Sequence, residues 1–151
     1  MGTRSLTRVI PRQEGLSFNE GHEKVDLAYV NMYRHLDGYP EGHGLDLAEF
    51  LKDIDIVNGI PLERNKMRFQ ANGTGCLAAQ MVKHFKEDVG YIYLHPHDKD
   101  GGWEEYIYTV YPKEGEETFI SIYEVYNKKC IFVGTSKQLL KKYKPNTNKK
   151  G

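Results

Sequence analysis

Alternating polar and apolar residues near the start of the chain predict two strands. Residues 5–10 alternate until Pro11, and residues 25–34 alternate again after a polar stretch at residues 13–24. Both runs are rich in Thr, Val, Ile and Tyr, which favour extended backbone. We therefore predict an antiparallel hairpin of residues 5–10 and 25–34, connected by a polar loop.

A period of two divides the side chains of the second predicted strand between opposite faces. Tyr33 shares one face with Asn31, and Arg34 shares the other with Met32. Hairpin pairing of this strand with the first also brings Arg4 close to Arg34.

Helical spacing replaces the alternation in the middle of the chain. Residues 45–57 form one apolar stripe, and a second stripe follows Asn72-Gly73-Thr74-Gly75, with Thr74 as the candidate N-cap. The residues of the two stripes are Leu47, Leu51, Ile54, Leu77, Met81 and Phe85.

From residue 91 onward the pattern returns to short strands separated by turn residues. The expected strands are residues 91–95, 103–111, 118–126 and 130–133, and a short helix follows at residues 136–143. Short turns between consecutive strands favour an antiparallel meander. The order ββ-αα-ββββ-α predicts an α+β fold, with an antiparallel sheet of about six strands and two helices packed on one face.

Length and composition predict one soluble domain. The 151 residues divide into a domain at residues 1–144 and a polar tail at residues 145–151. Lys plus Arg number 21 and Asp plus Glu number 21, which argues against general nucleic-acid binding or attachment to a membrane surface. The N-terminus has no apolar signal-peptide core, and no apolar run reaches the ~20 residues of a membrane span. We therefore expect a cytoplasmic protein.

The junction at residues 33–44, Tyr-Arg-His-Leu-Asp-Gly-Tyr-Pro-Glu-Gly-His-Gly, concentrates the candidate chemistry. It lies where a predicted strand gives way to a predicted helix, and the first amides of a helix attract anions. The amides of Gly42, His43 and Gly44, with the guanidinium of Arg34, therefore predict a phosphate or carboxylate pocket. The helix that follows Thr74 is a second, weaker candidate of the same kind.

Other side chains in the junction have alternative interpretations. Tyr39 lies in the glycine-rich loop, where its ring is available to stack on a base. His35 and His43 are candidate acids or bases, with Asp37 orienting one of the rings. The alternative is that Asp37 and Gly38 simply make a turn. His95 and the following polar residues border a predicted hairpin tip, so we assign them no metal.

Two motifs carry a resemblance to a known family. The opening Met-Gly-Thr-Arg-Ser-Leu-Thr and the Tyr-Arg-His-x-Asp-Gly-Tyr-Pro-x-Gly-His-Gly junction resemble small, largely uncharacterised proteins of bacteriophages, giant viruses and bacteria. The resemblance implies a viral or bacterial cytoplasmic setting, which is the host cytoplasm for a viral protein. It implies no catalytic residues.

The sequence thus leads to one functional hypothesis and two alternatives. The hypothesis is non-enzymatic binding of a phosphate-bearing small molecule, most readily a nucleotide, which in a phage protein would sequester a host nucleotide immune signal. The alternatives are a nucleotide phosphodiesterase or hydrolase that uses His35 or His43, and an interaction module that inhibits a host enzyme. We expect no cofactor, no metal and no membrane partner, and a homodimer is compatible with the edge strands and tyrosines. The predicted ligand-binding residues are Arg4, Arg34, His35, Asp37, Tyr39, Gly42, His43, Gly44 and Thr74.

Overall fold

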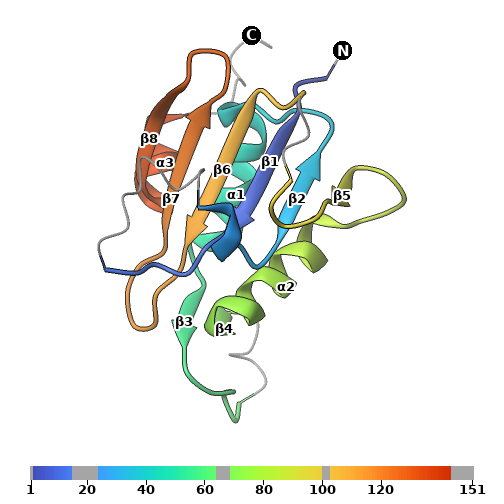
Figure 1. The fold of residues 1–151 in the computed structure, drawn as a ribbon. Coiled ribbons are helices and arrows are strands. Elements are labelled where there is room, and N and C mark those ends of the chain that lie inside the picture. The colour runs from blue at the N-terminus through green and yellow to red at the C-terminus, as the bar shows by residue number, and fades with distance from the viewer. Residues whose placement is uncertain (1, 15–23, 64–68, 100–102, 144–151) are drawn as a thin grey trace, which may run out of the picture.

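The computed structural model describes residues 2–14, 24–63, 69–99 and 103–143. Its main element is a six-stranded sheet in the order β5-β2-β1-β6-β7-β8 (Figure 1). The polar tail expected at residues 145–151 and most of the loop expected at residues 13–24 lie outside the described residues. The α+β fold is confirmed. The strands of this sheet are β1 (Ser5–Val9), β2 (Asn31–Arg34), β5 (Ile92–Leu94), β6 (Tyr106–Tyr111), β7 (Phe119–Glu124) and β8 (Lys129–Thr135).

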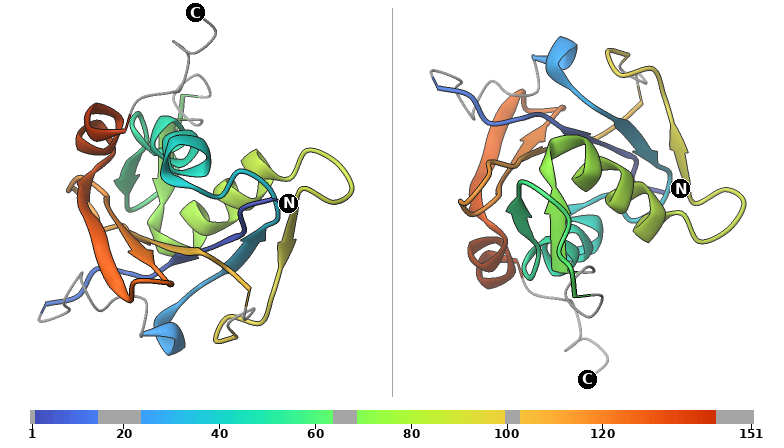
Figure 2. Two further views of the ribbon diagram at one scale, coloured as in Figure 1. Left: turned by 90° about the horizontal axis from the view of Figure 1, so that it is seen from above. Right: turned by 90° about the horizontal axis from the view of Figure 1, so that it is seen from below.

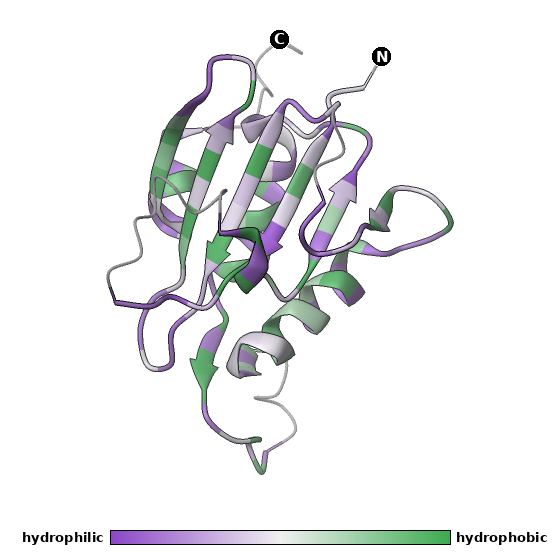
Figure 3. Cartoon of the chain, viewed as in Figure 1, coloured by the Kyte–Doolittle hydropathy of each residue, from purple (hydrophilic) through white to green (hydrophobic). Residues whose placement is uncertain are grey.

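The helices cover one face of the sheet (Figure 2). They are α1 (Leu45–Leu51), α2 (Gly73–Phe85) and α3 (Ser136–Lys142), and a two-stranded parallel sheet of β3 (Asp55–Val57) and β4 (Gln70–Asn72) lies beside them. The core fills the space between helices and sheet, with Leu47, Leu77, Met81, Val110 and Leu139 inaccessible to solvent. Figure 3 shows the alternation of apolar and polar residues along the central strands, which follows from the strand period of two.

The sheet is not the simple meander that we predicted. β6, β7 and β8 pair antiparallel in sequence, as expected. β5, however, pairs with β2 at the edge of the sheet, and β6 pairs parallel with β1 in the centre. The connection between β5 and β6 therefore crosses a face of the sheet instead of making a hairpin.

Two buried polar side chains hold that connection against the sheet. Arg8 donates from Nε to the carbonyl of His97 (3.2 Å) and from Nη2 to the carbonyl of Lys99 (3.0 Å). Asn31 donates from Nδ2 to the carbonyls of Pro96 (2.9 Å) and Lys99 (2.6 Å). These four bonds satisfy loop carbonyls that a hairpin would have satisfied by strand pairing.

Two element boundaries differ from the predictions by several residues more than the others do. Residues 25–27 form a 3-10 turn, closed by a bond from the Ala28 amide to the Val25 carbonyl, so the strand begins only at Asn31. The first helix ends at Leu51 instead of continuing to residue 57. The β-branched residues Ile54, Ile56 and Val57 favour extended backbone over helix, and they lie in or beside β3. Within the described residues, no helix has the length and apolar character needed to cross a bilayer.

Candidate functional site

Arg34 points into the protein, not toward solvent. It lies on the helix-covered face of β2, and 4% of its surface is exposed. Its Nε donates to the Leu36 carbonyl at 2.7 Å, and its Nη1 donates to His43 Nδ1 at 2.9 Å and to Asp46 Oδ2 at 3.2 Å. The guanidinium therefore ties the end of β2 to the start of α1, and the prediction that it projects into an open phosphate pocket is wrong.

His43 is the buried centre of this arrangement. Because a guanidinium only donates, Nδ1 accepts from Arg34, so Nε2 carries the ring hydrogen and donates to Thr7 Oγ1 at 2.8 Å. The rings of Phe85 and Tyr108 meet the imidazole edge-on, with centroids 5.2 and 5.0 Å away. Burial, and secondarily the charge of Arg34, lowers the pKa of His43 from 6.5 to about 3. A neutral, enclosed imidazole is a structural group, which argues against the predicted role of His43 as acid, base or ligand.

The amides expected to bind an anion have partners within the chain. Residues 40–44 form a π-helical turn that runs directly into α1. The Gly42 amide donates to the Tyr39 carbonyl (2.9 Å), the His43 amide to the Asp37 carbonyl (2.8 Å) and the Gly44 amide to the Tyr39 carbonyl (3.4 Å). The predicted anion pocket at Gly42, His43 and Gly44 is therefore wrong, because the π turn extends the helix backward and uses its free donors.

The glycines of the junction permit close packing instead. A Cβ on Gly38 would lie 2.8 Å from Ser5 Cβ and 2.9 Å from the Thr3 carbonyl oxygen, and a Cβ on Gly2 would lie 2.7 Å from the His35 carbonyl oxygen. The Gly38 amide also donates to the Thr3 carbonyl at 2.8 Å. The opening segment and the junction, which carry the family resemblance, thus lie directly against each other.

Arg4 and His35 lie at the same end of the β1–β2 ladder. The β1–β2 pairing ends at Ser5 and Arg34, and beyond it the Gly38 amide bonds to the Thr3 carbonyl, so Arg4 and His35 lie directly beyond the last pair of the ladder. Strand alternation places both with Tyr33 on the face away from the helices. The predicted hairpin pairing brings Arg4 to the end of β2, but the predicted neighbour, Arg34, is buried on the other face of the sheet.

Tyr33 anchors a cluster of rings on this face. Its hydroxyl lies 3.0 Å from His35 Nδ1, in hydrogen-bond contact. His95 stacks on the Tyr33 ring with centroids 5.0 Å apart and planes 10° apart, and the Tyr93 ring is 6.0 Å away. Tyr93 is 50% exposed and His35 is exposed. We call Arg4, Tyr33, His35, Tyr93 and His95 the β2–β5 face.

Sequence reasoning missed Tyr93 and His95 as members of this face, because it placed them in a hairpin with the next strand. The period of two alone puts both on one side of β5, but only the pairing of β5 with β2 brings that side next to Tyr33. The described residues contain no group of three or more metal-ligating side chains.

The remaining predicted residues do not join the β2–β5 face. Tyr39 is 38% exposed and donates from its hydroxyl to Asp37 Oδ1 at 3.2 Å, a bond that raises the pKa of Tyr39. Asp37 adopts a φ of 56°, so it forms a turn, which was the alternative interpretation. Thr74 lies inside the first turn of α2, whereas the N-cap is Asn72. Thr74 lies three helical turns, or about 16 Å along the helix axis, before Phe85, the residue of α2 that contacts His43.

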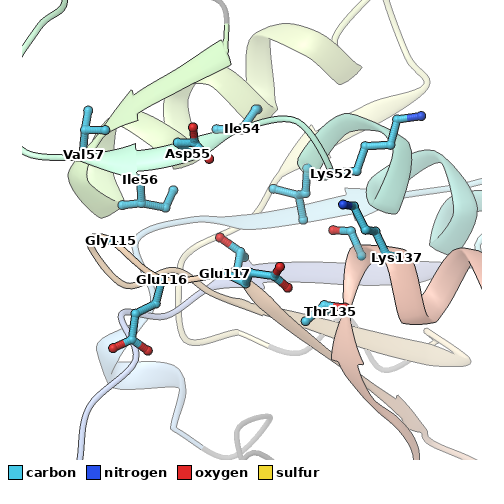
Figure 4. A pocket seen from close by; sticks show the side chains of 13 residues that line it. Lys52, Ile54, Asp55, Ile56, Val57, Gly115, Glu116, Glu117, Thr135 and Lys137 are labelled. Atoms are coloured by element: carbon cyan, nitrogen blue, oxygen red, sulfur yellow. The ribbon is translucent and has the colours of Figure 1, made fainter.

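A cavity of about 380 Å³ opens at the other side of the molecule. Figure 4 shows it between the segment that follows α1, the turn from β6 to β7 and the start of α3. The sequence interpretation missed it because residues 54–57 were assigned to a helix. Its lining residues include Leu51, Lys52, Ile54, Ile56, Glu117, Thr118, Thr135 and Lys137.

Comparison with known proteins finds no match: no family model, no curated protein and no solved structure is similar to this chain.

Proposed function

We propose that the protein binds a phosphate-bearing small molecule, specifically a nucleotide, on the β2–β5 face and does not turn it over. The observation that carries the proposal is the ring cluster of Tyr33, Tyr93 and His95, with Arg4 and His35 directly beyond the last β1–β2 pair. Aromatic faces stack on bases of any type, at about 1–3 kcal/mol per base. A guanidinium is a planar, two-pronged donor for phosphate.

In this arrangement each part of the ligand has its own partner. The half-exposed ring of Tyr93 stacks on the base, and Tyr33, held by His95 and His35, keeps that ring in place. Arg4 and the exposed edge of His35 bind phosphate. Lys86 adds a positive charge beside the same surface, because its Nζ lies 5.5 Å from the centre of the Tyr93 ring.

The chemistry of the histidines favours binding over hydrolysis. His43, one of the two candidate catalysts, is enclosed and held neutral by a pKa lowered to about 3. His35 has one ring nitrogen in contact with the Tyr33 hydroxyl. A general acid or base needs a second, matched group near the reacting bond, and Asp37 is turned toward Tyr39 instead.

The biological setting follows from the family resemblance and belongs to the same proposal. In a phage protein, a binding site without catalysis would lower the concentration of a host nucleotide immune signal by sequestering it. Such a protein acts in the host cytoplasm at a concentration comparable to that of its ligand.

Ligand recovery with mass analysis tests the proposal. Purified protein is incubated with cyclic di- and trinucleotides and with ADP-ribose derivatives, separated from free ligand and denatured. We expect one class of nucleotide to be recovered intact. Recovery of a cleaved product that disappears in His35→Ala would support the hydrolase, and co-purification of a host protein without any retained nucleotide would support the interaction module.

Matched variants locate the binding site. Tyr93→Ala and His35→Ala should each reduce retention roughly 5- to 140-fold, because each removes a contact of about 1–3 kcal/mol. The controls are Tyr126→Ala, whose ring is 90% exposed in the turn after β7, and His97→Ala, which is exposed in the loop after β5. Equal retention by the variants and their controls would refute the β2–β5 face as the site.

A further inference from the structure

The cavity beside α3 has the dimensions of a small-molecule site. Its volume of about 380 Å³ falls within the range of roughly 300–1,000 Å³ that is usual for ligand pockets. Its walls come from three parts of the chain that are distant in sequence: residues 51–57, 115–118 and 135–137. The cavity therefore lies where parts of both sheets meet, and it is separate from the β2–β5 face.

One ammonium and one carboxylate are available at the α3 end of this cavity. Lys52 is paired with Glu49 at 2.9 Å, and Glu116 is paired with Arg12 at 3.2 Å and with Lys113 at 3.5 Å. Lys137 and Glu117, by contrast, form no ion pair within the described parts of the chain. Figure 4 shows the Glu117 carboxylate extending toward Thr135 and the Lys137 amine directed away from its helix, over the same end of the cavity.

A buried hydroxyl in the lining also lacks a partner. Thr118 is 8% exposed, and its Oγ1 makes no hydrogen bond to any described residue. The same Oγ1 has less than 1 Å² of accessible surface, so the hydroxyl lies behind the cavity wall, and Thr118 offers no hydrogen-bonding group to the cavity.

The remaining wall is apolar. Leu51 and Ile56 are each only 3% exposed and offer little surface, but Ile54 and Val57 are half-buried and line the cavity. An apolar portion of a ligand that covers these side chains gains about 25 cal/mol for each Å² of apolar surface removed from water.

We propose that this cavity binds a free α-amino acid with an apolar side chain. Lys137 receives the carboxylate, and Glu117 receives the ammonium group. The side chain of the amino acid packs on Ile54 and Val57. A polyphosphate suits the cavity less well, because Glu117 and Asp55 both line it and repel additional negative charge.

Isothermal titration with free leucine, isoleucine, valine, methionine and phenylalanine tests this assignment. We expect at least one of them to bind, and we expect its N-acetyl derivative and its amide to bind at least tenfold more weakly, since each lacks one charge. Failure of all five to bind, or equal binding of the derivatives, would overturn the proposal.

Variants of the two charged residues complete the test. Lys137→Gln and Glu117→Gln should each weaken binding by at least tenfold, the effect of losing one charge-assisted hydrogen bond of about 1.5–3 kcal/mol. Both side chains are exposed, so neither change disturbs the core. The matched control is Lys141→Gln, an exposed lysine on the same helix that does not line the cavity. If Lys141→Gln weakens binding as much as Lys137→Gln, the amino acid binds through general charge and the assignment is wrong.

Discussion

Mild acidification should destabilise this protein through one histidine. His43 is enclosed between Arg34, Thr7 and two aromatic rings, and its burial lowers its pKa from 6.5 to about 3. The unfolded chain therefore binds a proton below pH 6.5 that the folded chain does not bind. The stability contributed by neutral His43 is fully present above about pH 6.5 and is lost as the pH falls toward 3.

The size of the effect follows from the linkage relation. Each pH unit below the unfolded pKa of 6.5 lowers the free energy of unfolding by about 1.4 kcal/mol. At pH 5, about 1.5 units below that pKa, the free energy of unfolding is therefore lower by about 2 kcal/mol. This figure depends on the unfolded pKa alone, provided that the folded pKa stays well below 5. Against a typical domain stability of about 5–15 kcal/mol, the loss is easily measured.

Urea denaturation at pH 7.5, 6.5, 5.5 and 5.0 provides the assay. The free energy of unfolding should be constant above pH 7 and then fall by about 2 kcal/mol at pH 5. His97→Asn, which changes an exposed histidine, should show the same dependence, and His43→Gln should show a much flatter one. A wild-type stability that does not change between pH 7.5 and 5, or an NMR signal showing His43 protonated at pH 5.5, would refute the reasoning.

Three substitutions test the packing around the junction, each by urea or thermal denaturation. Tyr108→Phe removes a buried hydroxyl that donates to the Gly38 carbonyl at 2.7 Å and should cost about 1–3 kcal/mol; a neutral effect would mean that this carbonyl is hydrated. Gly38→Ala places a methyl group within 2.9 Å of Ser5 and Thr3 and should cost about 1–3 kcal/mol, whereas wild-type stability would show that the opening segment is loosely held. Thr135→Ala removes the cap that accepts from the Gln138 amide at 3.3 Å and should cost about 1 kcal/mol, and no loss would indicate a frayed α3.

The α+β class could be predicted from the sequence because its signals are local. The apolar periods at residues 47–51 and 77–85 are long enough to define α1 and α2, and the turn residues between β6, β7 and β8 define their antiparallel pairing. The position of β5 could not be predicted in the same way. It depends on Arg8 and Asn31 holding a loop that is more than sixty residues away in the sequence.

The candidate site was harder to predict, although part of the answer was present in the strand pattern. The alternation in residues 31–34 already placed Arg34 on the same side as Met32, and the apolar side of a strand faces the core. Burial of the guanidinium follows from that pattern. The hydrogen-bond partners of Arg34 do not follow from the pattern. His43 reaches Arg34 because residues 40–44 form a π turn, and no sequence signal predicts that turn.

The opposite face was predictable in part. Register in a two-stranded hairpin is enough to bring Arg4 near the end of β2. The residue opposite Arg4 does not follow from that register, because the register breaks between Arg34 and Gly38, whose amide bonds to Thr3. Tyr93 and His95 required knowledge of which strand β5 joins.

The most direct test of the account is an NMR titration of the uniformly ¹⁵N-labelled protein with the nucleotide that it retains. We predict that the largest shifts fall on Arg4, Tyr33, His35 and Tyr93, and that the amide signals of residues 42–44 hardly move, since their donors are occupied within the chain. Shifts centred on residues 42–44, or no shifts at millimolar nucleotide, would contradict binding at the β2–β5 face.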